Sequence, residues 1–366
     1  MNTTLAARWI FLASLTLLLL SCSGKGDDVV DPKSGDRKEM AFVAVEGNGG
    51  DDLTRFNEAA QTADVGEYAK SNGAPLGKTI DAIFEANERL YLHHRGLGEI
   101  SVLDLKTRKL IGTITGFPNG TAGALCGMAF SNVSQAWGIC YGSNNLYLID
   151  AINLNIARII PLPGNPTAVG TVKNKVFVGM VMPDGSAKVA VFSSNGGEYP
   201  IEHQLDMPTA PIYIFGNPDG QQMVVLTSGN PGTDTAIADD DVRPMLHYIL
   251  LSTMTVDGVS TIEVPSLDRY IGQEPNFAAR TKDYLLYIAT PIGVSLAETA
   301  GRGVFPLWLP GDFRVLGADY YSSMVYIYDP ATASVRRLLA DATEYTPTTF
   351  GGAVRAVQFV NANAVQ

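Results

Sequence analysis

From Ala41 onward, short apolar runs alternate with polar turns, and long stretches with a helical period are almost absent. The runs, such as 89–94 and 100–105, are rich in β-branched, aromatic and leucine residues. Gly, Pro, Asn and Asp residues separate them. Short runs with strand-like periodicity between turn-forming residues predict many β-strands. The pattern therefore predicts an all-β fold.

A unit of three such runs recurs along the chain. The runs are 89–94, 100–105 and 109–114 in one copy, and 135–140, 145–150 and 155–160 in the next. Asp104 and Asp150 end the middle runs and stand 46 residues apart, so 41–361 has room for about seven units. Repetition at this period is typical of a β-propeller. We predict seven blades, with six as the alternative because 266–320 is hard to divide.

The two ends of the repetitive region complete one another. Residues 41–46 form a strand-like run with no innermost strand upstream, and 354–360 form another at the C-terminus. A ring of blades closes stably when no long strand edge is left unpaired. We expect 354–360 to pair with 41–46 and to close the first blade.

The repeat resembles the YVTN-repeat propellers, which are related to the periplasmic YncE type. The likeness is carried by Leu90-Tyr91-Leu92, by 102–107 and by Gly112-Thr113-Ile114, and it is most specific over 80–205 and 312–340. It implies four antiparallel strands in each blade. It also implies a structural aspartate at the end of the third strand, whose carboxylate accepts hydrogen bonds from the amides of the next turn.

The first residues have the pattern of a targeting signal. Arg8 precedes the apolar run 9–20, which is too short to span a bilayer. Leu19-Leu20-Ser21-Cys22 then resembles a bacterial lipobox. That resemblance implies a diacylglyceryl group on the Cys22 thiol and cleavage just before Cys22. The alternatives are an ordinary signal peptide or an accidental cysteine after a hydrophobic start.

The signal predicts three parts and an address. We expect a lipoprotein signal peptide over 1–21, a lipidated Cys22 with a polar tether over 22–38, and a propeller over 39–366. Asp27 and Asp28 resemble the surface-export signal of Bacteroidetes lipoproteins. The two acyl chains of such an anchor suffice for stable membrane attachment. The expected location is the cell surface, on the outer membrane, with membrane contact through the lipid anchor only.

Composition narrows the function classes. The chain has 366 residues, 46% of them hydrophobic and 17% charged, so a large core is available. Its 37 Gly and 20 Pro residues suit a fold with many turns. The net charge of −11 and the lack of a Lys/Arg-rich run argue against nucleic-acid binding.

Motifs for catalysis and for metal binding are absent from the sequence. It contains no G-x-S-x-G, P-loop, G-x-G-x-x-G or C-x-x-C pattern. His93 and His94 are neighbours on a predicted strand, so their side chains should point to opposite faces. We therefore assign no catalytic residue, no cofactor and no metal site.

Two features stay open at this point. The acidic loop 229–242 could help to bind Ca²⁺ through its aspartates, but it lacks the spacing and turn glycine of an EF-hand, and a solvated loop is favoured. Cys126 and Cys140 fall on neighbouring strands of one blade. They could form a disulfide in an oxidising compartment, although two buried thiols are favoured.

One face of the predicted propeller carries the candidate ligand site. Connections from second to third strand, and from blade to blade, share that face. With the strands divided among the blades in this way, the candidate ligand-binding residues are His94, Arg95, Phe117, Asn119, Tyr141, Asn144, Tyr270, Tyr320 and Tyr321. Aromatic rings beside Arg and Asn donors suit a medium-sized polar and aromatic ligand. The alternative is that individual tyrosines only pack between blades.

The anchor and the fold together point to a function class. Surface lipoproteins of this build in the Bacteroidetes include propellers that capture cobalamin and others that hold siderophores. The resemblance implies capture of a corrinoid, or next a siderophore or haem, for delivery to a TonB-dependent outer-membrane transporter. The first alternative is a non-catalytic scaffold of a surface complex. The second is a propeller enzyme resembling a dehydrogenase or lactonase.

Overall fold

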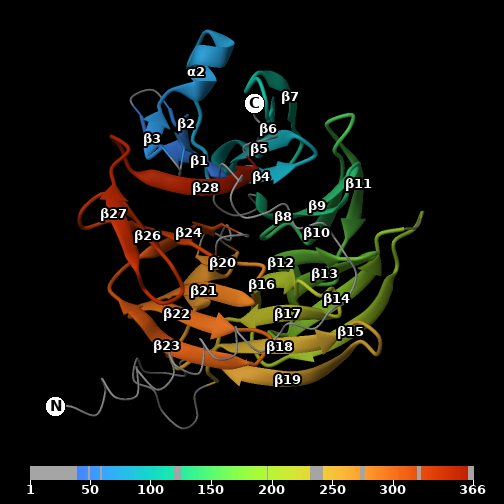
Figure 1. Cartoon of the computed structure of the whole chain (residues 1–366). Coiled ribbons are helices and arrows are strands. Elements are labelled where there is room, and N and C mark those ends of the chain that lie inside the picture. Colours follow the sequence, from blue (N-terminus) through green and yellow to red (C-terminus); the bar gives the residue numbers. More distant parts are fainter. Residues whose placement is uncertain are drawn as a thin grey trace, which may run out of the picture. The chain divides into compact units, whose positions relative to one another are not determined.

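The computed structural model describes residues 39–47, 50–57, 60–118, 125–195, 197–230, 242–272, 277–319 and 323–361. Over these residues the chain forms seven four-stranded antiparallel sheets, arranged as the blades of a propeller (Figure 1). The predicted seven-bladed β-propeller is confirmed, and the six-bladed alternative is wrong. No helix within the described ranges is long and apolar enough to cross a membrane.

Each blade runs from an innermost strand beside the central channel to an outermost strand at the rim. Blade 1 consists of β28 (Val354–Asn361), β1 (Glu39–Val45), β2 (Asp52–Asn57) and β3 (Thr62–Asp64). Blade 2 consists of β4 (Ala82–Ala86), β5 (Arg89–His94), β6 (Glu99–Asp104) and β7 (Leu110–Ile114). Blade 3 consists of β8 (Leu125–Asn132), β9 (Gln135–Cys140), β10 (Asn145–Asp150) and β11 (Asn155–Pro161).

The remaining blades follow in chain order. Blade 4 consists of β12 (Asn165–Val172), β13 (Lys175–Val181), β14 (Ala187–Ser193) and β15 (Ile201–Met207). Blade 5 consists of β16 (Pro211–Gly216), β17 (Gln222–Thr227), β18 (Met245–Leu250) and β19 (Thr255–Thr261). Blade 6 consists of β20 (Ala278–Arg280), β21 (Leu285–Thr290), β22 (Gly293–Glu298) and β23 (Gly303–Pro310). Blade 7 consists of β24 (Arg314–Ala318), β25 (Val325–Asp329), β26 (Ser334–Leu338) and β27 (Glu344–Thr348).

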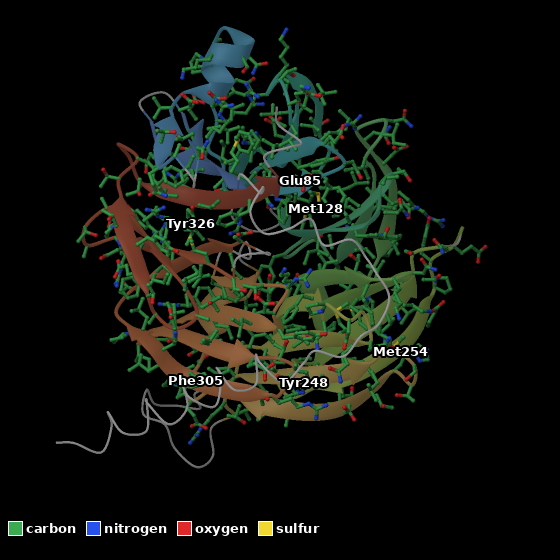
Figure 2. The ribbon with its side chains drawn as sticks, in the orientation of Figure 1. Glu85, Met128, Tyr248, Met254, Phe305 and Tyr326 are labelled. Carbon is green, nitrogen blue, oxygen red and sulfur yellow. The ribbon has the colours of Figure 1, made fainter. Side chains whose placement is uncertain are left out.

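The core lies between neighbouring blades. The middle strands β5 and β21 are buried along nearly their whole length, whereas the outermost strands β11 and β15 are mostly exposed. A strand covered on both faces needs apolar residues at consecutive positions. Side chains such as Tyr248 and Tyr326 are fully buried, and side chains fill the spaces between the sheets (Figure 2).

The ring closes through the two ends of the described chain. β28 pairs antiparallel with β1, with Phe42 opposite Gln358 and Val43 opposite Val357. A register shift at Ala44/Val45 ends the regular pairing. The predicted closure of the first blade is therefore confirmed, and it leaves β1 paired on both edges.

Aspartate turns recur at the ends of strands in several blades. Asp104 and Asp150 end third strands as predicted, and each accepts backbone hydrogen bonds from its turn, as in Thr107 N to Asp104 Oδ1 at 2.6 Å. Asp329 makes the same kind of bond to Ala331 N, but it ends β25, a second strand. The reason is that an aspartate turn fits any hairpin of suitable length.

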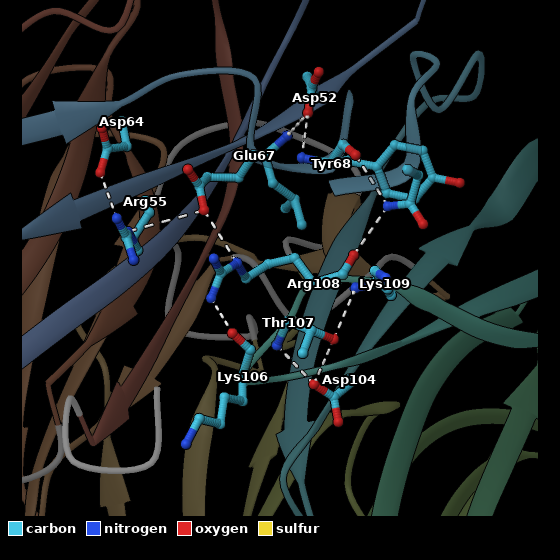
Figure 3. Close-up of polar contacts among 12 residues, drawn as sticks. Asp52, Arg55, Asp64, Glu67, Tyr68, Asp104, Lys106, Thr107, Arg108 and Lys109 are labelled. Atoms are coloured by element: carbon cyan, nitrogen blue, oxygen red, sulfur yellow. Dashed lines mark hydrogen bonds and ion pairs between the residues drawn. The ribbon is translucent and has the colours of Figure 1, made fainter. Parts of the chain in front are cut away.

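One insertion interrupts the propeller pattern at the rim. The connection 65–81 between blades 1 and 2 contains the helix α2 (Glu67–Asn72). Glu67 Oε2 lies 3.1 Å from Arg108 Nε and 3.9 Å from Arg55 Nε (Figure 3). The Asn72 side chain donates to the carbonyl of Arg108 at 3.0 Å and accepts from Leu110 N at 2.8 Å. These contacts fix α2 to β2 and to the turn between β6 and β7.

Candidate functional site

The candidate face is the end of the propeller that carries the second-to-third-strand connections and the connections between blades. In blade 2 the relevant connection contains η1 (Arg95–Leu97), and in blade 3 it is 141–144. Between blades 5 and 6 the long connection 262–277 contains η2 (Asp268–Tyr270). These three connections hold the candidate residues that the structure brings together.

Residues 262–272, called here the crossing segment, reach across this face. The Arg95 side chain donates from Nη2 to the carbonyl of Gly272 at 2.9 Å. Gly272 has a φ of +67°, and a Cβ placed on it would lie 2.3 Å from Tyr141 Cγ. Only glycine accommodates both that conformation and that contact. Arg95, Tyr141 and the crossing segment thus meet, although they come from different parts of the ring.

Tyr270 lies within the crossing segment and is held by its neighbours. Its ring stacks on Phe277 at a centroid distance of 4.2 Å and an angle of 13°. Arg269 donates to its hydroxyl at 2.6 Å, and the guanidinium lies 4.8 Å from the ring centroid. Burial raises the pKa of the Tyr270 phenol, with the Arg269 charge opposing that shift. The ring is half-buried and fixed in place.

Two candidates lie in the interior instead of facing a ligand. His94 is 1% exposed; its Nδ1 donates to the Thr79 carbonyl at 2.6 Å, and its Nε2 accepts from Ser101 Oγ at 2.9 Å. Burial lowers the pKa of His94 to about 4, so the imidazole is neutral at pH 7. Phe117 is 6% exposed and packs edge-on against Tyr147. Both residues support the connections of the candidate face.

Of the remaining candidates, the structure describes Asn144. Asn144 is exposed at a turn with a φ of 50°, and its carbonyl accepts from Leu162 N at 2.8 Å. Cys22, Asn119, Tyr320 and Tyr321 lie outside the described residues. Tyr320 and Tyr321 were predicted on the candidate face, in a second-to-third-strand or blade-to-blade connection. The described strands on either side of them, β24 and β25, are the first and second strands of blade 7.

The acidic loop and the cysteine pair are described only in part. Residues 231–241 of the acidic loop lie outside the described residues, which include only its ends, where Asn230 and Val242 form a β-bridge. Cys140 is fully buried at the end of β9, whereas the side chain of Cys126 is not among those described. In the described part of the chain, no three His, Cys, Asp or Glu side chains form a group that could hold a metal ion.

Sequence reasoning missed the central channel. Two cavities of about 270 and 350 Å³ lie against the innermost strands, and both are lined by Phe84, Tyr213 and Arg280. Arg280 Nη1 donates to the Gly216 carbonyl at 2.7 Å, and burial raises the pKa of the Tyr213 phenol. The positions that line the channel become clear only when each strand's place in its blade is known, and the sequence pattern alone does not identify them.

Comparison with known proteins supports the fold and nothing finer. No model of a known protein family and no curated protein matches the chain. A Bacteroides fragilis protein with the provisional name 6-phosphogluconolactonase is similar in structure, with a TM-score of 0.58 and 11% identity over 90% of this chain and 100% of that one.

Two further solved structures are similar to this chain. Hydrazine synthase from Kuenenia stuttgartiensis gives a TM-score of 0.57 and 14% identity, over 79% of this chain and 90% of that one. AztD from Citrobacter koseri gives 0.54 and 9%, over 88% and 98%. At such low identity these likenesses define the class of fold, a β-propeller, and assign no activity.

Proposed function

We propose that the protein is a cell-surface lipoprotein that captures a small-molecule nutrient for a TonB-dependent outer-membrane transporter. A corrinoid is the first expected ligand, and a siderophore or haem is next. The single observation that carries the proposal is the meeting of Arg95, Tyr141 and the crossing segment on one face. The lipobox-like Cys22 and the YVTN-like repeat support the surface address and the family.

The geometry of this face favours binding without rearrangement. Arg95 is tied to Gly272, Tyr141 packs on the same glycine, and Tyr270 is stacked on Phe277. Side chains that are already ordered lose little conformational entropy when a ligand arrives. Leu97, which is 52% exposed in the same turn as Arg95, adds an apolar surface. The result is a rigid platform with aromatic, apolar and cationic groups.

The shape of the platform suits a broad ligand. Corrinoids and haem carry a large flat macrocycle with polar substituents. Such a ligand can lie over a face without entering the channel. Aromatic side chains and Arg are also the residues that most often dominate binding energy at protein surfaces. Tyr141, Tyr270 and Arg95 are therefore the expected principal contacts.

The direct test is calorimetric titration of the full chain, purified in detergent, with cobalamin, cobinamide, haem and a set of siderophores. We expect one class to bind. Replacing Tyr141 or Tyr270 by alanine should weaken that binding at least tenfold, about 1.4 kcal/mol. Tyr345→Ala is the matched control, because Tyr345 is an exposed tyrosine on the outermost strand β27. Binding of no compound would favour the scaffold alternative, and turnover of a bound compound would favour the enzyme alternative.

The anchor is tested separately. Cys22→Ala should release the protein from membranes or leave the signal unprocessed, because the thiol is the proposed lipid attachment site. The readout is the fraction that stays with membranes after a carbonate wash. Retention equal to that of the unchanged protein would contradict the lipoprotein proposal.

A further inference from the structure

The central channel contains a second potential site, separate from the candidate face. Its two cavities, of about 270 and 350 Å³, share Phe84, Tyr213 and Arg280 and are otherwise lined by residues of the innermost strands. Volumes of this order are near the lower end of the range for small-molecule pockets, roughly 300–1,000 Å³. The space is large enough for a small organic molecule and much too small for a corrinoid.

The chemistry of the channel wall is unusual for this protein. Among the described residues that line the two cavities, Arg280 is the one charged side chain. The chain as a whole is acidic, with a net charge of −11. The remaining lining consists of apolar and aromatic side chains, backbone, and a few neutral polar groups such as Gln358 and Thr171. Arg280 thus brings a positive charge into a channel whose wall combines polar groups with aromatic and aliphatic side chains.

The position of Arg280 is fixed by its surroundings. Nη1 donates to the Gly216 carbonyl at 2.7 Å, and the guanidinium carbon lies 5.7 Å from the Phe215 ring centroid. Tyr213 lines both cavities with it, and its ring lies 5.5 Å from that of Phe215. An ordered guanidinium presents a planar set of donors that matches a carboxylate. The arrangement joins a cation, a phenol and flat rings in one space.

We propose that the central channel binds a small carboxylate with a planar apolar body, and that Arg280 binds its charged group. One positive side chain in the wall matches a monoanion. Phe84 and Tyr213 supply ring surfaces for the apolar body. This inference stands apart from the proposed function, because none of its residues belongs to the platform of the candidate face.

The topology indicates the end from which the ligand enters. Arg280 and Gly216 are the last residues of the innermost strands β20 and β16, so they lie at the end opposite the candidate face. At the candidate face, the crossing segment reaches from blade 5 to Arg95 of blade 2. Because this segment lies across the candidate face, we infer that the ligand enters the channel from the opposite end. The charged group therefore meets Arg280 near the entrance, and the apolar body extends inward.

The test uses benzoate as the probe and benzamide as its neutral counterpart, titrated into the full chain and followed by calorimetry. We expect benzoate to bind at least tenfold more tightly than benzamide, because only benzoate carries a charge for Arg280. This comparison needs no variant. Equal affinity for the two probes, or binding of neither, would overturn the inference.

Variants then locate the interaction. Arg280→Gln should weaken benzoate binding at least tenfold and leave benzamide binding unchanged, whereas Arg280→Lys should retain part of the benzoate preference. Arg314→Gln is the matched control, since Arg314 is an exposed arginine on the neighbouring innermost strand β24. An Arg280→Gln protein that melts normally and binds benzoate like the unchanged protein would contradict the assignment.

Two further readouts separate this site from the platform. Ala318→Phe, which fills the larger cavity, should remove the binding of both probes. Neither Arg280→Gln nor Ala318→Phe should change the affinity for a corrinoid, haem or siderophore bound on the candidate face. Because Arg280 also lines the smaller cavity, benzoate binding that survives Ala318→Phe but is lost in Arg280→Gln would confine the ligand to that cavity. Binding that survives both substitutions would place the site outside the channel and overturn the proposal.

Discussion

The two long connections between blades, 65–81 and 262–277, are held in opposite ways. The first folds against its own neighbours, with α2 fixed by the buried Glu67 and by Asn72. The second leaves its neighbours and crosses the candidate face, where Gly272 meets Arg95. The first connection is thus part of the structural frame. The second forms part of the platform on which a ligand can lie.

His94 is the last residue of β5 and Arg95 follows it, and each of the two holds one of these long connections. His94 donates to the Thr79 carbonyl in the first connection, and Arg95 donates to the Gly272 carbonyl in the second. His94 is buried with both ring nitrogens bonded, whereas Arg95 is half-exposed. The two neighbouring residues therefore differ: His94 stabilises the face from inside, whereas Arg95 reaches its surface.

The largest expected effect comes from removing β28, the innermost strand of blade 1. Truncation after Gly352 deletes β28 and leaves β1 with an unpaired edge. Blade 1 also supports the first connection, because Asp51 accepts from Ile80 N at 2.7 Å and Asp52 from Tyr68 N at 3.1 Å. We expect an insoluble protein or the loss of a cooperative melting transition. Truncation after Asn361 is the control, and a Gly352 truncation that melts within about 2 °C of the full chain would contradict the closure.

A smaller effect is expected at the contact that fixes α2. The Glu67 side chain is 7% exposed and lies between Arg55 and Arg108, so Glu67→Ala leaves the partly buried Arg108 guanidinium without its carboxylate. Removing one member of a buried ion pair costs about 3 kcal/mol. Asp64→Ala is the matched control, because that 53% exposed carboxylate also pairs with Arg55 and should cost less than about 1 kcal/mol. Chemical denaturation measures both, and equal losses would contradict the special role of Glu67.

The fold could be predicted because its signals are local. Strand runs and turn residues repeat along the chain, and the unmatched runs at 41–46 and 354–360 indicated the closure. The Asp329 turn is a local signal, and it does not specify which pair of strands it joins. The helix α2 is too short for a helical period to be recognised.

The site was only partly predictable because it depends on distant contacts. The expected order of strands and connections placed Arg95, Tyr141 and Tyr270 on one face. Their meeting at Gly272, however, joins residues that are far apart in the sequence. The channel was missed for a different reason. The pairing of β16 with β17 shifts register between Pro211 and Tyr213. A one-residue shift changes which side chains face the channel, and alternation alone does not reveal it.

The buried histidine predicts a pH effect of intermediate size. Burial holds the pKa of His94 at about 4, below the usual value of 6.5, so the folded protein binds the proton more weakly than the unfolded chain. Stability should therefore be full above about pH 6.5 and fall as the pH drops toward 4, by about 2 kcal/mol at pH 5. His247, with a similarly lowered pKa, adds a comparable loss.

The contribution of His94 can be separated by substitution. His94→Gln should remove about half of this acid dependence between pH 7 and 5, measured by denaturation at each pH. His203→Gln is the control, because His203 is exposed on the outermost strand β15. An unchanged pH dependence in His94→Gln would contradict the buried neutral histidine and its support of the first connection.

The smallest expected change in stability concerns the second connection. Arg95→Gln removes the bond to the Gly272 carbonyl, and the loss of one half-exposed, charge-assisted hydrogen bond costs about 1 kcal/mol. Hydrogen exchange should rise at the Tyr270 and Ile271 amides, which bond within the crossing segment, and stay unchanged in 65–81. Arg89→Gln is the matched control, since Arg89 donates to the Ala151 carbonyl away from this face. If Arg95→Gln leaves exchange at Tyr270 and Ile271 unchanged, the crossing segment is held without Arg95, and the distinction between the two connections does not depend on this residue.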